Sequence, residues 1–98
     1  MDRSLLEIAK KQAARCAAMG NARRLMILWM ISQEELSVTE IAQRAESSLQ
    51  NISQHLKILK NAGMVTTRRH GQTIYYQIAD DDCVKQCPAL LKPPEIPE

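Results

Sequence analysis

Two cysteines near the carboxyl end of the sequence, Cys83 and Cys87, are well suited to chemistry. They are four positions apart, so on a helix both thiols lie on one face. Paired thiolates can bind a soft metal ion, and paired thiols can respond to oxidation or to a persulfide donor. A disulfide between them would need the helix to be distorted, and Pro88 would allow that. The alternative is that both cysteines are incidental, since a free cysteine often behaves as a small apolar residue.

The third cysteine, Cys16, makes the number of thiols odd, which does not suggest a secreted disulfide scaffold. The amino-terminal segment lacks the basic and then apolar pattern of an export signal. No apolar run approaches the roughly 20 residues that a spanning helix needs. The sequence therefore predicts a soluble cytoplasmic protein without a membrane partner.

The chain has 98 residues, the size of one small domain. We expect residues 1–91 to form that domain and residues 92–98 to form a flexible tail. Hydrophobic residues make up 45% of the chain, but it contains no phenylalanine, one tryptophan and two tyrosines. A core built from so few large side chains is small, which favours oligomerisation as a source of further buried area.

A second set of chemically informative residues lies in the segment 47–63, SSLQNISQHLKILKNAG. Its apolar stripe, which we expect to be buried, consists of Leu49, Ile52, Leu56 and Leu59. The other side of its first two turns carries uncharged hydrogen-bonding side chains, which both donate and accept, as an adenine edge does. A glutamate there would repel phosphate, and a lysine would bind DNA without discriminating between bases. The predicted base contacts are Gln50, Asn51 and Gln54, followed by Ser53, while Ser48 and His55 would meet phosphate or cap the structure.

The charge distribution supports a polyanionic partner. Residues 47–79 contain no aspartate or glutamate but include Lys57, Lys60, Arg68 and Arg69. The tip of a predicted hairpin carries the last two of these with His70 and Gln72. A basic hairpin can lie along the DNA backbone or enter the minor groove. We therefore predict DNA contacts from Lys57 and from the hairpin residues Arg68, Arg69, His70 and Gln72.

The elements that would position these residues can be placed from periodicity and caps. Helical spacing predicts a first helix ending at Gly20 and a central helix over 22–32. Ser37 and Glu40 match a capping box for a helix over 37–45, and Ser48 caps the next helix, which Gly63 ends. The pattern then alternates on both sides of residues 70–72, which predicts a hairpin, and a short last helix follows 80–82. The predicted fold is mainly α with a small β-hairpin, a winged helix-turn-helix of order α-α-α-α-β-β-α, whose second short helix enters the DNA major groove.

The motifs NARRLMIL, ELSVTEIAQRA, NISQHLKILKNAGMV and RRHGQTIYYQI occur in this order within residues 19–78. Together they resemble the ArsR/SmtB repressors. The resemblance implies a homodimeric repressor that binds a near-palindromic DNA operator and releases it when an inducer binds. It also implies that the first and last helices form the dimer interface.

The resemblance leaves the inducer open. Arsenic sensors of this family carry E-L-C-V-C where this chain has ELSVT, so Ser37 and Thr39 replace the two cysteines. The family's zinc site on the last helix needs histidine, and no histidine follows His70. At the implied interface, Cys16 could approach Cys83 and Cys87, and three thiolates would suit arsenite or another thiophilic metal ion. His55 and His70 already have DNA-facing interpretations and are not favoured as metal ligands.

Three alternatives stay open from the sequence alone. The protein could be a redox-controlled regulator without a metal site, a constitutive regulator, or a winged-helix module for protein interactions. The uncharged polar cluster at 50–54 argues against the last, because protein-binding faces more often expose aromatic or aliphatic anchors. An enzyme is not expected, since the sequence has no glycine-rich phosphate loop and no strand-borne nucleophile with a histidine partner.

Overall fold

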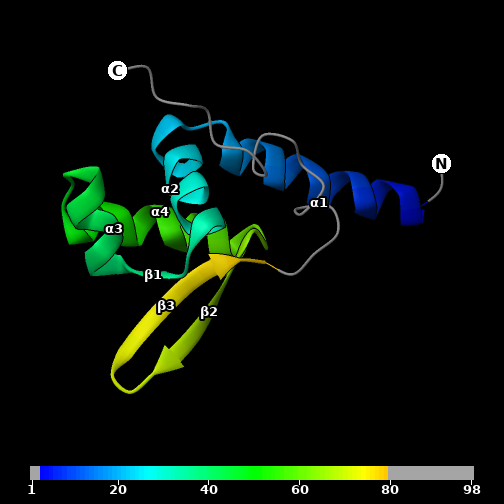
Figure 1. Ribbon diagram of the computed structural model, residues 1–98. Helices are drawn as coiled ribbons and strands as arrows, with labels where there is room; N and C mark the ends of the chain where they lie inside the picture. Colours follow the sequence, from blue (N-terminus) through cyan, green and yellow to red (C-terminus); the bar gives the residue numbers. More distant parts are fainter. Residues whose placement is uncertain (1–2, 80–98) are drawn as a thin grey trace.

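The computed structural model describes residues 3–79 of the chain. Its elements are α1 (Arg3–Met19), α2 (Ala22–Gln33), β1 (Leu36–Ser37), α3 (Val38–Ala45), α4 (Leu49–Asn61), β2 (Val65–His70) and β3 (Thr73–Ile78) (Figure 1). Four helices followed by a hairpin confirm the predicted winged helix-turn-helix. The predicted last helix, with Cys83 and Cys87, and the predicted tail at 92–98 lie outside the described residues.

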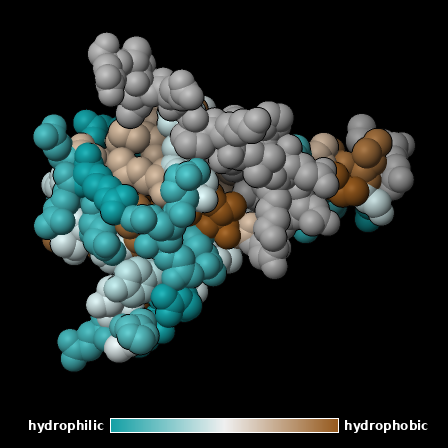
Figure 2. Space-filling view, in the orientation of Figure 1, coloured by the Kyte–Doolittle hydropathy of each residue, from teal (hydrophilic) through white to brown (hydrophobic). Residues whose placement is uncertain are grey.

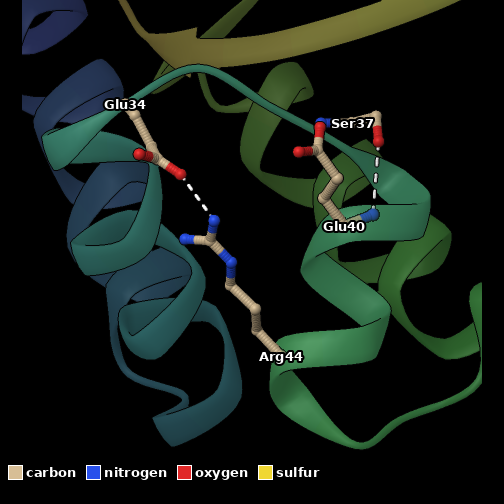
Figure 3. A network of polar contacts seen from close by, with 4 residues as sticks. All are labelled: Glu34, Ser37, Glu40 and Arg44. Carbon is tan, nitrogen blue, oxygen red and sulfur yellow. Dashed lines mark hydrogen bonds and ion pairs between the residues drawn. The ribbon is translucent and has the colours of Figure 1, made fainter.

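Side-chain caps begin α2 and the two helices of the helix-turn-helix unit, α3 and α4, where the sequence predicts these helices. The Asn21 side chain accepts hydrogen bonds from the first turn of α2. At α3, Ser37 Oγ accepts from the Glu40 amide at 3.2 Å while the Ser37 amide donates to Glu40 Oε1 at 3.0 Å (Figure 3). The Ser48 side chain caps α4. These bonds satisfy amide groups that no carbonyl within the helix can reach.

The strand β1 was not predicted from the sequence. Its two residues pair with β3, Leu36 opposite Tyr76 and Ser37 opposite Tyr75, so the sheet order is β1-β3-β2. Ser37 is thus both a strand residue and the cap of α3. The hairpin is therefore anchored beside the start of the helix-turn-helix unit.

The β2–β3 hairpin, here called the wing, projects away from the helices (Figure 1). Its strands pair from Val65 opposite Ile78 to His70 opposite Thr73, which leaves a two-residue loop. Gly71, the first loop residue, has a φ of 63°. Glycine takes this conformation without steric cost, as the first position of a tight hairpin loop requires.

The core lies between α2, α3, α4 and the start of the wing. Its fully buried large side chains are Ile27, Leu28, Leu36, Ile41, Ile52, Leu56, Leu59 and Met64. The prediction that Leu49 joins the buried stripe of α4 is wrong, because its exposed fraction is 51%. Leu49 is the first residue of the helix, and side chains on a helix lean toward its amino end. Its side chain therefore extends beyond the core that covers Ile52.

The helix α1 contributes little to this core. Only Ala18 of its 17 residues is buried, near its carboxyl end. Leu5 and Ile8 are 64% and 63% exposed, and hydrophobic surface is visible at the amino-terminal end of α1 in Figure 2. One side of α1 thus carries apolar surface that no other part of residues 3–79 covers. No helix within these residues is long and apolar enough to cross a membrane.

Candidate nucleic-acid interface

The exposed side of α4 carries one continuous polar stripe. Gln50, Ser53, Gln54 and Lys57 are all exposed and follow the i, i+3, i+4, i+7 spacing of one helix face. We call these four residues the recognition stripe. The opposite face holds the buried Ile52, Leu56 and Leu59. The packing of these apolar residues fixes the helix axis, so the amides and hydroxyl of the stripe point outward.

Asn51 and Ser48 differ from the stripe because both have partners within the chain. The Asn51 side chain is half-buried, and its Nδ2 donates to Ser47 Oγ at 2.8 Å. The Asn51 amide donates to Ser48 Oγ at 3.1 Å, so Ser48 acts as the helix cap. These bonds hold the turn between α3 and α4 in shape. Both residues remain predicted DNA contacts. Each would have to contact DNA while keeping its hydrogen bond within the chain.

His55 is half-buried in a basic environment that the sequence did not reveal. Its Nδ1 lies 3.5 Å from Arg24 Nη1, and Arg24 Nε donates to the Ala18 carbonyl at 2.7 Å. Burial and the charges of Arg24 and Arg23 lower the pKa of His55 below its usual 6.5. The start of α2 thus places two arginines near α4. Arg23 and Arg24 stand out in the sequence two and three positions after Asn21, but nothing there placed them beside His55.

The wing tip presents Arg69, His70 and Gln72, all exposed. Arg69 Nε donates to the Gly71 carbonyl at 3.2 Å, which leaves its other nitrogens available. The surface of the hairpin is hydrophilic to neutral in Figure 2. This arrangement suits contacts with phosphate groups, which need positive charge and hydrogen-bond donors rather than apolar area.

Arg68 contacts two other side chains within the described residues. Its Nε and Nη2 both donate to Glu35 Oε2, at 2.9 and 2.7 Å. Its guanidinium carbon also lies 5.4 Å from the centre of the Tyr75 ring. The carboxylate raises the pKa of Arg68, and the arginine lowers the pKa of Glu35. Arg68 therefore braces the wing, a role that the sequence did not predict because Glu35 is distant in the chain.

A second ion pair, Arg44 Nη2 to Glu34 Oε1 at 2.6 Å, joins α3 to the end of α2 (Figure 3). Glu34 and Glu35 are neighbours, so one short segment binds both α3 and the wing. The geometry between α3 and the wing is set in part by this segment.

The predicted sulfur site is only partly within the described residues. Cys16 is exposed on α1 with a free thiol. Within residues 3–79, no three histidine, cysteine, aspartate or glutamate side chains cluster in a way that could hold a metal ion. The Ser37 hydroxyl, at a position where arsenic sensors carry cysteine, serves as the cap of α3.

Comparisons with known proteins agree with this geometry. A family model described as a helix-turn-helix domain matches residues 19–68. The chain is 45% identical over 65 residues to the transcriptional activator HlyU of Vibrio cholerae, covering 66% of this chain and 60% of HlyU. It is 39% identical over 84 residues to the nodulation protein NolR of Rhizobium meliloti, covering 86% of this chain and 69% of NolR. The chain thus spans less than two thirds of the length of HlyU.

Among solved structures, one similar fold is the solution structure of a homodimeric winged helix-turn-helix DNA-binding domain from Mycobacterium bovis, from a possible ArsR-family transcriptional regulator. The TM-score is 0.80 at 33% sequence identity, and the match covers 87% of this chain and 79% of that one.

Proposed function

This chain belongs to the ArsR-type winged helix-turn-helix transcriptional regulators, and from that premise we propose that it is a homodimeric repressor of a near-palindromic operator. Membership also confirms that the protein is of a regulator class and not an enzyme. The second helix of such a unit enters the major groove and contacts base edges through its amino-terminal residues.

One observation carries the proposal. The recognition stripe is uncharged except for Lys57, it faces outward, and residues 47–79 contain no acidic side chain. Gln50 and Gln54 can each donate and accept at an adenine edge, and Ser53 can bond either kind of base. Lys57 and Arg69 supply the positive charge that holds the protein on phosphate groups.

The dimer is supported by α1. Its exposed Leu5 and Ile8 would be buried by a second copy, and the similar M. bovis domain is homodimeric. A dimer would also present two recognition stripes, as a two-fold operator requires. The variant carrying Leu5→Glu and Ile8→Glu should shift the mass measured by sedimentation toward the monomer. The matched control, Ile74→Glu, changes an exposed isoleucine of the wing and should leave the mass unchanged.

We further propose that release from DNA depends on thiols. The exposed Cys16 thiol supports this, together with the spacing of Cys83 and Cys87 in the sequence. Thiolates bind arsenite and other soft ions, and thiols react with oxidants and persulfides. Operator release should be measured with arsenite, zinc, and a disulfide or persulfide donor, for wild type and for Cys83→Ser with Cys87→Ser. If none of these agents loosens wild-type binding, thiol control is wrong, while repression itself is not affected.

The repressor proposal is tested by selecting duplexes from a random-sequence pool with the full-length protein. We expect a two-fold consensus whose half-sites lie about one helical turn apart. Affinity for it should fall steeply with salt, because each phosphate contact releases about 0.9 of a counterion. A selection that enriches no sequence, or binding that salt does not weaken, would contradict the proposal.

A further inference from the structure

Leu49 is an apolar side chain placed among hydrogen-bonding ones. It is 51% exposed at the first position of α4, directly after the Ser48 cap. A single leucine on a protein surface needs no explanation by itself. Leu49, however, precedes the exposed Gln50 and lies one helical turn before the exposed Ser53, so it borders the recognition stripe.

Within residues 3–79, the Leu49 side chain is only half covered. Leu49 lines a shallow surface hollow between α3 and α4, together with Thr39, Ala42, Gln43, Glu46 and Ser47. The buried stripe of α4 begins only at Ile52. Because side chains on a helix lean toward its amino end, Leu49 would contact a molecule that approaches the amino end of α4.

In a DNA complex, the amino end of this helix approaches base edges in the major groove. The largest apolar group on those edges is the C5-methyl group of thymine, because the C–H groups of cytosine and of the purines are smaller and the remaining positions donate or accept hydrogen bonds. Leucine can neither donate nor accept, so that methyl group is its best match. The amides of Gln50 and Gln54 match adenine edges, and adenine and thymine pair with each other.

We propose that Leu49 is a specificity-determining residue that packs against the C5-methyl group of a thymine in each operator half-site. This inference rests on the proposed function and adds one base position to it. Burial of one methyl group should strengthen binding by about fourfold in each half-site. The position would be read by contact alone, without a hydrogen bond.

The test uses the duplex that wild-type protein selects, with each thymine replaced in turn by deoxyuridine, which lacks the methyl group. Wild type should lose about fourfold in affinity for one thymine of each half-site. Leu49→Ala should bind the thymine duplex more weakly by the same factor and should no longer distinguish it from the uracil duplex. Alanine is a strong helix former and Leu49 is exposed, so this variant should keep the wild-type circular dichroism spectrum.

Ile58→Ala is the matched control, because Ile58 is an apolar residue of the same helix and is 44% exposed. It should keep the full response to uracil. The inference is overturned if wild type is indifferent to every uracil replacement, or if Leu49→Ala keeps the response. It is also overturned if Ile58→Ala loses the response equally, or if Leu49 proves to bind a partner protein instead. In each of these cases the protein would still bind its selected duplex with sequence preference and salt dependence. If the repressor proposal itself were wrong, that selective binding would be missing as well.

Discussion

Arg68 of the wing and Glu35 before β1 form an ion pair in which two guanidinium nitrogens donate to one carboxylate oxygen, at 2.9 and 2.7 Å. Glu35 lies in the segment that joins α2 to the helix-turn-helix unit, so the pair ties the wing to the body that carries α4. A pair with two donors has a defined direction, which a single contact lacks. We therefore expect Arg68 to help hold the wing against the body of the domain.

The first prediction concerns this brace. Glu35→Gln and Arg68→Gln should each speed amide hydrogen exchange in β2 and β3. Exchange in the double variant should be no faster than in either single variant, because all three variants remove the same ion pair. The pKa of Glu35 is lowered from 4.5, so its stabilisation is complete above that pH and is lost as pH falls through the lower, folded-state pKa. If Arg68→Gln reduced the salt dependence of DNA binding while Glu35→Gln left exchange unchanged, Arg68 would be a phosphate contact instead.

The second prediction concerns His55. Its pKa is below 6.5 in the folded protein because of burial and of the charges of Arg24 and Arg23. The unfolded chain therefore binds the proton more readily, and the free energy of unfolding should fall as pH drops below about 6.5. The fall should level off below the folded-state pKa. Urea unfolding across this range measures it.

His55→Gln should remove this inflection from the curve of stability against pH. The control is His70→Gln, which changes an exposed histidine at the wing tip and should leave the inflection in place. An inflection that persists in His55→Gln would assign the titration to another group.

The third prediction uses two residues with positive φ, one after each helix of the helix-turn-helix unit. Glu46 ends α3 with a φ of 51°, a left-handed conformation that costs a residue with a Cβ atom about 1 kcal/mol. Glycine adopts this conformation without that cost, but it also makes the unfolded chain more flexible. The two effects together should let Glu46→Gly raise the free energy of unfolding by about 0.5 kcal/mol.

Gly63 after α4 supplies the reverse test, with a φ of 76°. An added Cβ there would find no close atom, the nearest being Arg15 Nη2 at 3.8 Å, so any cost is backbone strain. Gly63→Ala should lower the free energy of unfolding by about 1 kcal/mol. Thermal unfolding measures both changes. If Glu46→Gly and Gly63→Ala shifted the free energy of unfolding in the same direction, this explanation would be contradicted.

Much of the fold follows from local signals in the sequence. The capping box of Ser37 and Glu40 and the Ser48 cap mark helix starts because their hydrogen bonds join residues three positions apart. Gly71 marks the hairpin loop because the positive φ that the loop needs is a property of this one residue. Such features need no knowledge of distant residues.

The features that sequence patterns missed depend on distant contacts. The pairing of Leu36 with Tyr76 forms β1, and no two-residue segment carries a strand signal of its own. Leu36 did carry a different signal, since an apolar residue before the cap often packs on the residue four positions into the helix, here Ile41, and both are fully buried. Periodicity also assigned Leu49 to the core, because spacing alone cannot show where the covering elements end.

The central claim is that the side-chain amides of Gln50 and Gln54 on α4 determine which bases the protein prefers. The most direct test compares binding of the selected duplex and of a scrambled duplex by wild type, by the variant Gln50→Ala with Gln54→Ala, and by Gln33→Ala, an exposed glutamine at the end of α2. The double variant should lose about 10- to 100-fold of the preference for the selected duplex while its salt dependence stays the same, and the control should match wild type. A double variant that keeps both its affinity and its base preference would contradict the account.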